Sequence, residues 1–253
     1  MYPFIHLGTE LKLPTYLLII SLAYCLCLLF LLPRAKRLKM NANIALDLAL
    51  IIMVCGFLGA RFLHIFYEEP SYYFQEPLQA LYFWNGGFVF LGGLLGALLG
   101  VYAYLKKKGE SFLAWVDFYA PFAPLGYAIG RIGCFLNGCC YGKACALPWA
   151  VEFPHILPHG IGRHPTQIYV VIWEVLLLIL ILNLHKVKKL KTGSLFFTWL
   201  LLSSMGRLVM EYFREDDRGA FIFNLSISTW ISLILITVSG LFLFRKNNVV
   251  KLG

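Results

Sequence analysis

The feature that most constrains this fold is a series of long apolar runs, several of them without a charged residue. Leu13–Leu32, Pro77–Leu105 and Gly219–Phe244 contain no Asp, Glu, Lys or Arg. Each run is long enough to cross the roughly 30 Å hydrocarbon core of a bilayer as a helix, which takes about 20 residues. Inside lipid every backbone N–H and C=O needs a partner within the protein, so helices are the expected form.

Four further apolar segments carry one or two charges each, which brings the expected number of transmembrane helices to about seven. Only 14% of the residues are charged, whereas an ordinary soluble domain has about 25%. We therefore predict an all-α, polytopic integral membrane protein with a single membrane-embedded domain at residues 1–253. The predicted helices span residues 13–33, 44–67, 86–105, 112–136, 165–185, 193–213 and 225–244, with an outer loop at residues 137–164.

The basic residues indicate how these helices are oriented. The chain has a net charge of +9, but most of its Lys and Arg residues lie in every second loop. The positive-inside rule makes those loops cytoplasmic, which places the N-terminus outside and the C-terminus in the cytoplasm. This topology signal explains the charge, so binding to nucleic acid is not expected. The basic residues in question are Arg34, Lys36, Arg37, Lys39, Lys106, Lys107, Lys108, Lys186, Lys188, Lys189, Lys191, Arg245, Lys246 and Lys251.

The first apolar run is expected to remain in the protein. Its basic cluster follows the run, and no small-residue cleavage site comes after it, which is unlike a cleaved signal peptide.

In this orientation the polar and glycine-rich segments fall at the outer ends of six helices. A charge within the membrane costs at least about 2.5–3.5 kcal/mol, so ionisable residues there are functional candidates. The outer leaflet is therefore the expected position of the site. The residues concerned are Tyr16, Arg61, Trp84–Gly87, Gly130–Gly142, Arg163–Gln167, Arg207, Glu211 and Arg214.

Several of these features also have a purely structural interpretation. Gly92, Gly96 and Gly100 recur at every fourth position, which favours close packing of helices. Arg207 and Glu211 are spaced i, i+4, and this spacing is also consistent with an ion pair that only neutralises two charges.

Three further features differ in how well a structural interpretation explains them. Glu174 shares a helix face with Gln167, which fits a helix–helix hydrogen bond as well as a catalytic group. Residues 214–218 are expected to form a solvated outer loop. Arg131, by contrast, lies among glycines in a stretch that is unsuited to a regular helix. Irregular backbone at membrane depth survives where it is buried in protein or lines a wet cavity, so this segment is predicted to be functional.

The cysteines fall into two groups. Cys25, Cys27 and Cys55 lie within apolar helices and are expected to fill space. Four others lie at the outer face, with the spacing C-x4-C-C-x4-C, and three histidines follow them. This spacing matches no zinc pattern of the C-x2-C kind, so no metal site and no cofactor are predicted. A disulfide from Cys145 to Cys139 or Cys140, or a reactive thiol beside Arg131, remain alternatives. The outer group comprises Cys134, Cys139, Cys140 and Cys145.

Two arginines from different helices at the lipid headgroup level suit a phosphate group. A guanidinium binds phosphate oxygens in a bidentate way that lysine cannot match. At the outer leaflet the obvious phosphate belongs to a phospholipid. An enzyme that transfers part of that lipid would use Arg131 and Arg207 to stabilise the leaving phosphate.

Several motifs resemble one known family. Gly130-Arg131-Ile132-Gly133-x-Phe135-x-Asn137-Gly138, with Gly142, resembles the signature of prolipoprotein diacylglyceryl transferases, bacterial enzymes that modify lipoprotein precursors. The resemblance covers nearly the whole chain. Other segments in the family's order are Tyr16, Asn85–Gly87, Gly92–Leu94, Asp117–Pro121, Arg163–Tyr169, Arg207–Arg214 and Leu225–Trp230.

The resemblance implies transfer of the diacylglyceryl group from phosphatidylglycerol to a lipobox cysteine thiol, with glycerol phosphate as the leaving group. The expected location is the bacterial inner membrane, with the site facing the outer leaflet. Arg131 and Arg207 would hold the phosphodiester, Glu211 would orient Arg207, and Tyr16 and Asn137 would shape the headgroup pocket. The remaining candidates are His164 as a catalytic residue, and Arg61, Asn85, Gly86, Gly87, Gly92, Gly93, Gly133, Gly142, Gln167 and Arg214 as substrate-binding residues.

The sequence departs from the family pattern at three positions. Leu91 stands where the family usually has a histidine, Cys134 replaces an asparagine and Cys139 replaces a glutamate. The histidine is a natural base for the acceptor thiol, so an alternative is a paralogue that uses the same lipid with another acceptor. A transporter or a non-catalytic lipid-binding protein is less favoured, because the chain has no internal repeat and its polar groups lie toward one leaflet.

Overall fold

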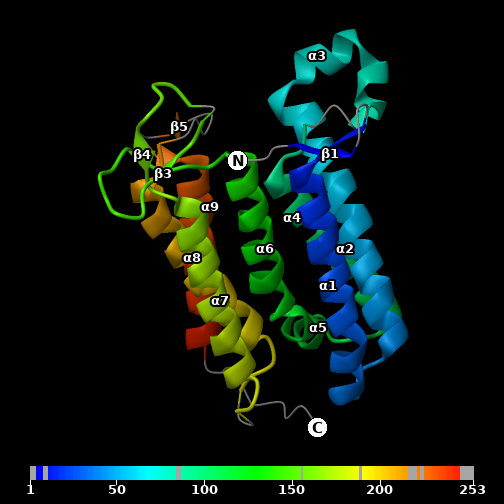
Figure 1. Ribbon diagram of the computed structural model, residues 1–253. Coiled ribbons are helices and arrows are strands. Elements are labelled where there is room, and N and C mark those ends of the chain that lie inside the picture. Colours follow the sequence, from blue (N-terminus) through cyan, green and yellow to red (C-terminus); the bar gives the residue numbers. More distant parts are fainter. Residues whose placement is uncertain are drawn as a thin grey trace. The chain divides into compact units, whose positions relative to one another are not determined.

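A computed structural model describes residues 4–7, 11–83, 87–154, 156–187, 190–215, 221–222 and 225–245. The chain forms two compact units, shown in Figure 1. Unit 1 comprises Met1–Cys27 and Leu113–Gly253, and unit 2 comprises Leu28–Phe112. The first half of α1 (Thr15–Arg37) belongs to unit 1 and the second half to unit 2. The prediction of a single domain stays a prediction.

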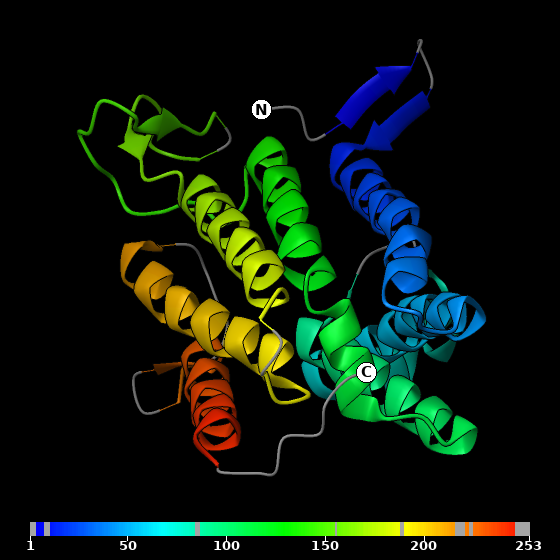
Figure 2. The ribbon, with the colours of Figure 1, turned by 90° about the horizontal axis from the view of Figure 1, so that it is seen from below.

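Unit 1 contains a row of helices that run alternately in opposite directions (Figure 1). In this row α6 packs against α7, α7 against α8, and α8 against α9. The end-on view in Figure 2 shows α8 between α7 and α9. The end of α6, the start of α7, the end of α8 and the start of α9 therefore lie at the same end of unit 1. Besides α1, the unit comprises β1 (Phe4–Leu7), β2 (Leu11–Pro14), α5 (Phe112–Tyr119), α6 (Phe122–Asn137), β3 (Val151–Glu152), β4 (Gly162–Arg163), α7 (Thr166–Leu184), α8 (Ser194–Phe213), β5 (Phe221–Ile222), β6 (Leu225–Ser226) and α9 (Ile227–Phe244).

Unit 2 is organised around the close packing of α2 against α4. An added Cβ at Gly92 would lie 2.3 Å from the Gly59 carbonyl oxygen, and one at Gly96 would lie 2.3 Å from that of Cys55. The backbones approach this closely because glycine has no side chain, so the predicted packing role of the glycine repeat is confirmed. Besides α1, the unit comprises α2 (Ala42–Leu63), a π-helical turn (His64–Glu68), α3 (Pro70–Gln75), a 3-10 turn (Pro77–Leu81) and α4 (Phe90–Lys108).

Four helices within the described residues are long and apolar enough to cross a bilayer. They are Thr15–Arg37, Ala42–Glu68, Thr166–Leu184 and Ile227–Phe244. Large apolar side chains such as Leu29 remain exposed along such helices, as expected for surfaces that face lipid. The chain is therefore an all-α integral membrane protein, and the strands among the described residues form short two-stranded pairs.

Most of the predicted helix boundaries lie close to the observed ones. The structure begins α7, α8 and α9 one or two residues after the predicted positions. The predicted single helix at residues 112–136 is wrong, because the chain breaks into α5 and α6 at Ala120–Pro121. Proline has no N–H to donate and disfavours helical geometry at the residue before it.

Two other boundaries differ from prediction at helix ends. The first helix continues to Arg37 with Pro33 inside it, rather than ending at residue 33. The third predicted helix begins at Phe90 rather than residue 86, and residues 84–86 lie outside the described part of the chain. In the predicted outer loop at residues 137–164, β3 pairs antiparallel with β4, with Val151 opposite Arg163.

Candidate functional site

Arg131 lies in α6, two turns before a tight fold-back of the chain. Gly138 ends the helix in the left-handed region, with φ of 78°. The Cys139 N–H then donates to the Cys134 carbonyl at 3.2 Å. This geometry is a common way to end a helix with glycine. It directs the following residues back toward the face of α6 that carries Arg131.

The structure brings Arg131, Gln167, Arg207 and Arg214 together around one small cavity in unit 1. These residues come from α6, α7, α8 and the segment after α8, which are far apart in the sequence. Cys140, Thr166, Val170 and Met210 complete the lining. The cavity measures about 10 Å³, roughly the room that one water needs. A phosphate group would therefore require the lining side chains to move apart.

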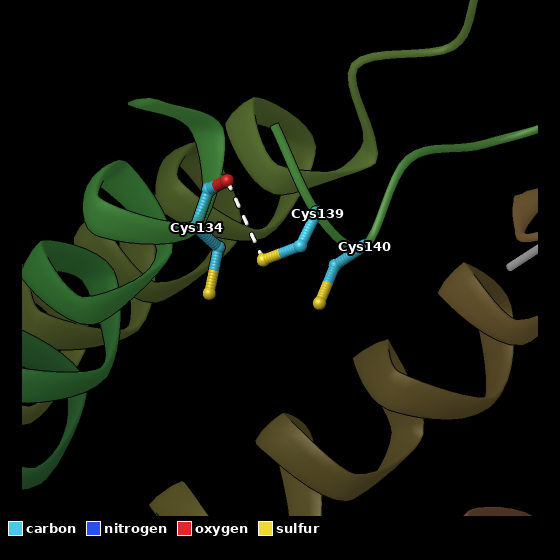
Figure 3. A group of neighbouring side chains, drawn as sticks. All are labelled: Cys134, Cys139 and Cys140. Carbon is cyan, nitrogen blue, oxygen red and sulfur yellow. Dashed lines mark hydrogen bonds between the residues drawn. The ribbon is translucent and has the colours of Figure 1, made fainter. Parts of the chain in front are cut away.

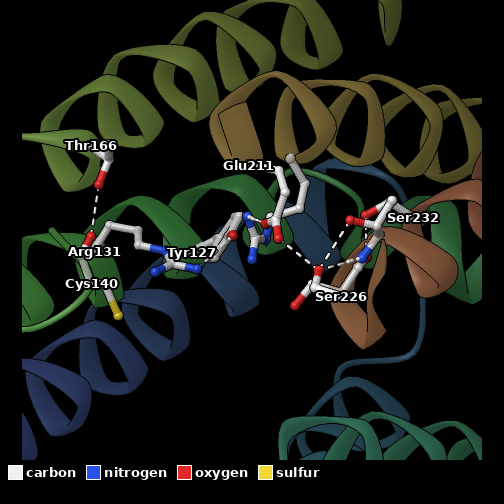
Figure 4. Close-up of polar contacts among 10 residues, drawn as sticks. Tyr127, Arg131, Cys140, Thr166, Glu211, Ser226 and Ser232 are labelled. Atoms are coloured by element: carbon white, nitrogen blue, oxygen red, sulfur yellow. Dashed lines mark hydrogen bonds and ion pairs between the residues drawn. The ribbon is translucent and has the colours of Figure 1, made fainter. Parts of the chain in front are cut away.

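Arg131 is held at this cavity by a tyrosine one turn earlier on the same helix. Its Nη2 donates to the Tyr127 hydroxyl at 2.9 Å, and its guanidinium carbon lies 4.9 Å from the centre of that ring (Figure 4). A guanidinium has five N–H donors, so this hydrogen bond leaves donors that face the cavity. Sequence reasoning did not identify Tyr127, although its i, i+4 spacing from Arg131 is visible in the sequence.

Arg207 is oriented by an acid on its own helix and a serine on the next. Its Nη1 lies 2.7 Å from Glu211 Oε2, so the predicted i, i+4 ion pair is present. Ser226 Oγ donates to Glu211 Oε1 at 2.6 Å (Figure 4). The same hydroxyl accepts from the Thr229 N–H at 3.2 Å and caps α9. Ser226 therefore ties the acid of α8 to the start of α9.

The start of α7 anchors the loop that follows α6. Gln167 Nε2 donates to the Cys139 carbonyl at 2.6 Å, and Thr166 Oγ1 donates to the Cys140 carbonyl at 2.7 Å. Gln167 is 1% exposed, and within the described residues its Oε1 has no hydrogen-bond partner. Because a carbonyl can only accept, the side-chain atom of Gln167 that faces the Cys139 carbonyl must be the NH₂ nitrogen, and the other atom is the oxygen. An unpartnered buried acceptor at a cavity points to a ligand that donates a hydrogen bond.

Gly142 and His164 lie where this loop meets the start of α7 and the end of α8. The Gly142 N–H donates to the His164 carbonyl at 2.9 Å, and Gly142 forms an antiparallel bridge with Arg214. A Cβ at Gly142 would lie 2.7 Å from the Phe213 carbonyl oxygen, which explains the glycine. The His164 Nδ1 lies 3.1 Å from the Tyr169 hydroxyl.

Tyr16, Asn137 and His164 are not among the residues that line the cavity as described above. Tyr16 lies beside α6 near the start of α1, because a Cβ at Gly133 would be 3.2 Å from its ring. Asn137 is the last residue of α6. The two residues therefore lie in the same unit as the cavity.

In unit 2, Arg61 is buried and donates to four backbone carbonyls. Its guanidinium reaches the oxygens of Gln79 at 2.9 Å, Ala80 and Gly87 at 3.3 Å, and Tyr82 at 3.4 Å. The side chain therefore holds the segment that leads into α4.

A histidine that sequence reasoning missed lies in the same part of unit 2. Buried His64 has its Nδ1 2.6 Å from Glu68 Oε2, at i, i+4 spacing. A Cβ at Gly87 would lie 2.2 Å from His64 Nε2, and Gly87 itself has φ of +79°. Gly93 packs on α2, since its Cβ would be 3.2 Å from the Gly56 carbonyl oxygen. The candidates Asn85 and Gly86 lie outside the described residues.

Two buried acids have structural partners. Glu174 accepts from Trp199 Nε1 at 2.9 Å and from Ser203 Oγ at 2.6 Å, which joins α7 to α8. Asp117 accepts from the Gly193 N–H at 2.6 Å and the Phe196 N–H at 2.9 Å, and so caps α8. The helix–helix hydrogen bond that was one interpretation of Glu174 is confirmed.

Comparison with known proteins agrees with this arrangement. The chain matches the family described as prolipoprotein diacylglyceryl transferase over residues 3–245. A phosphatidylglycerol–prolipoprotein diacylglyceryl transferase from Clostridium tetani (strain Massachusetts / E88) is 35% identical over 244 residues, covering 95% of this chain and 96% of that protein. A protein of the same name from Chromobacterium violaceum is 34% identical over 263 residues, covering 92% and 91%. Another from Nitrosomonas europaea is 37% identical over 195 residues, covering 76% and 69%.

Proposed function

Because the chain belongs to the prolipoprotein diacylglyceryl transferase family, we propose that it transfers the diacylglyceryl group of phosphatidylglycerol to a cysteine thiol. The acceptor is the lipobox cysteine of a lipoprotein precursor. The thiol sulfur attacks the glyceryl carbon that bears the phosphate, and the bond from that carbon to the phosphate oxygen breaks. The products are a thioether and glycerol phosphate, and the thiol proton passes to a base.

The observation that carries this proposal is the cavity lined by Arg131, Arg207 and Arg214. Clustered positive charge away from water is costly unless a negative group accompanies it. Glu211 pairs with Arg207 and offsets one of these positive charges. A phosphodiester would supply a further negative group, and a guanidinium can bind two of its oxygens. As the carbon–oxygen bond breaks, the phosphate gains a second negative charge. Donors that are already in position stabilise this developing charge most in a site with little water.

The glycerol end of the donor suits Gln167. The headgroup of phosphatidylglycerol carries hydroxyls beyond the phosphate, and a hydroxyl can donate to the unpartnered Gln167 Oε1. Entry of the headgroup requires the 10 Å³ cavity to widen. Met210 has a flexible thioether side chain and lines the cavity, so its movement would make room.

The neighbouring residues have supporting roles in this proposal. Glu211, held by Ser226, orients Arg207, and Tyr127 orients Arg131. Tyr16 and Asn137 shape the headgroup pocket, and His164 is proposed as a catalytic residue. Gly142 allows a close approach of the Phe213 backbone, and Gly133 leaves room for the Tyr16 ring beside α6.

In unit 2 we propose substrate binding for a set of glycine-rich residues. They are Asn85, Gly86 and Gly87 before α4, and Gly92 and Gly93 in its first turn. Arg61 supports these residues by donating to the Gly87 carbonyl and to three carbonyls of the preceding residues 79–82.

We further propose seven transmembrane helices in the bacterial inner membrane, with the N-terminus outside, the C-terminus in the cytoplasm and the site at the outer leaflet. The alternating basic loops support this orientation. A reporter that is active only outside the cytoplasm should work when fused after Glu76 or Lys143. It should fail after Lys108 or Lys191, and activity after Lys108 would overturn the orientation.

The test of the activity is incubation of purified protein with phosphatidylglycerol and a lipobox peptide. The expected products are the thioether peptide and glycerol phosphate in equal amounts, with none from a peptide whose cysteine is replaced by serine. Leu91, in place of the family's histidine, favours one alternative, a paralogue with another acceptor. Headgroup release without peptide modification would support that alternative and contradict the lipoprotein acceptor.

A further inference from the structure

Three thiols converge at the outer end of α6. Cys134 lies on the last turns of the helix, and Cys139 and Cys140 follow the fold-back at Gly138. Their three sulfur atoms all lie within 4.8 Å of one another. Figure 3 shows the three side chains directed into the same space. All three cysteines carry free thiols.

The backbone around these thiols is held in an unusual conformation. Cys140 has φ of 64°, in the left-handed region that residues other than glycine seldom adopt. The carbonyls of Cys139 and Cys140 each accept a short hydrogen bond from the start of α7. Strained positions persist where the surroundings hold them, and they often mark functional sites. Here the two hydrogen bonds from α7 hold the backbone of Cys139 and Cys140 in this conformation, so that their thiols face that of Cys134.

We propose that Cys134, Cys139 and Cys140 bind one thiophilic metal ion, of the class of Zn²⁺ or Cu⁺, through their three sulfur atoms. A zinc–sulfur bond is about 2.3 Å long, so three sulfurs around one ion lie roughly 4 Å apart. The observed cluster is close to that spacing. Sulfur ligands select soft ions over Mg²⁺ or Ca²⁺.

The charge of the surroundings fits such a site. Three thiolates around a divalent ion leave one net negative charge. Arg131 lies one turn before Cys134, and Cys140 lines the same cavity as Arg131 and Arg207. These guanidinium groups offset the negative charge of the thiolates. A bound ion would also fix Cys140 at the edge of the cavity, which gives the metal a route to affect the donor site.

The spacing of these cysteines did not predict a metal site, because zinc motifs place two ligands on one short turn. Here a ligand on a helix meets two consecutive ligands from the loop after it. The reversal of the chain at Gly138 brings the loop cysteines next to Cys134, and this proximity can be seen only in the three-dimensional structure.

The test uses the full-length protein in detergent, reduced and freed of metal with a chelator. Cd²⁺ is added in steps, the sulfur-to-metal charge-transfer absorption is recorded, and Zn²⁺ is then used as a competitor. We expect one ion per chain in the wild type. Cys139→Ser and Cys140→Ser should each bind at least about 100-fold more weakly, since even a residue that only supports a ligand costs 10–100-fold.

Cys145→Ser is the matched control, because Cys145 lies in the same outer loop but outside the cluster. It should bind metal like the wild type. Size-exclusion profiles and thermal midpoints recorded without metal establish that each variant is folded. Unchanged affinity in Cys139→Ser and Cys140→Ser, or equal loss in Cys145→Ser, would overturn the proposal. So would a disulfide between two of the three cysteines in protein whose thiols were alkylated before cell lysis.

Discussion

Arg61 and Arg131 are both arginines near the end of an apolar helix, but their guanidinium groups have different partners. Arg61, in unit 2, donates to four backbone carbonyls and is buried. Arg131, in unit 1, is half-buried and lines a cavity, and its hydrogen bond within the described residues goes to Tyr127. A guanidinium whose N–H donors are bonded to backbone carbonyls stabilises the local fold. A guanidinium that lines a cavity and has further N–H donors can bind an anion.

The largest effect is expected for substitution of Arg131. Arg131→Ala should lower headgroup release from phosphatidylglycerol by about 10²–10³-fold, as expected when one preorganised donor to a developing charge is lost. Arg131→Lys keeps the charge but loses the planar guanidinium, which can donate two parallel hydrogen bonds to a phosphate, so it should also be severely impaired. Arg37→Ala, at an exposed arginine at the end of α1, is the control and should be unaffected. Near-normal release by folded Arg131→Ala would make Arg131 a structural residue like Arg61.

Arg207→Ala should reduce release to a similar extent. The double variant with Arg131→Ala should be little worse than either single variant, because both residues serve one step and their effects are not additive. A multiplicative loss in the double variant would mean that the two arginines act independently.

Substitution of Arg61 should affect folding more than turnover. Arg61→Ala removes four hydrogen bonds to part-buried regions of the backbone, and a typical hydrogen bond contributes about 0.5–1.5 kcal/mol. The thermal midpoint in detergent should fall clearly, while the release per folded molecule should fall less than for Arg131→Ala. A normal midpoint combined with abolished release would move Arg61 to the group of lipid-binding arginines.

The smallest effect is expected at Ser226, which acts on Arg207 only through Glu211. Ser226→Ala removes one hydrogen bond to the acid and should lower release by roughly 2- to 10-fold. Ser226→Thr keeps the hydroxyl and should restore most of the activity. If the threonine variant is as slow as the alanine variant, the bond to Glu211 does not position Arg207.

The sequence predicted well those features that depend on pattern along the chain. Apolar runs bounded by charge predicted α7 to α9 closely. The costly charges at Arg131 and Arg207 predicted that two helices would meet at one site. The break between α5 and α6 was missed because the apolar pattern continues through Ala120–Pro121, although the proline itself was a signal.

Features that depend on backbone acceptors could not be predicted in this way. The partners of Arg61 are carbonyl oxygens, which every residue carries and no residue type identifies. The hydrogen bonds from the start of α7 to the Cys139 and Cys140 carbonyls could not be predicted for the same reason. The thiol cluster requires the fold-back after Gly138, and its ligand spacing resembles no linear motif.

The most direct test of the contrast between Arg61 and Arg131 is a solid-state NMR measurement in phosphatidylglycerol bilayers. It detects dipolar coupling between the lipid ³¹P and ¹⁵N-labelled arginine side chains. Guanidinium nitrogens that bind phosphate lie about 2.7–2.9 Å from its oxygens, so coupling is expected in the wild type. It should weaken in Arg131→Lys and fall further in the variant with both Arg131→Lys and Arg207→Lys, in which Arg214 still lines the cavity. It should persist in Arg61→Lys. Full coupling in the double variant, or its loss in folded Arg61→Lys, would contradict the assignment of the phosphate to Arg131 and Arg207.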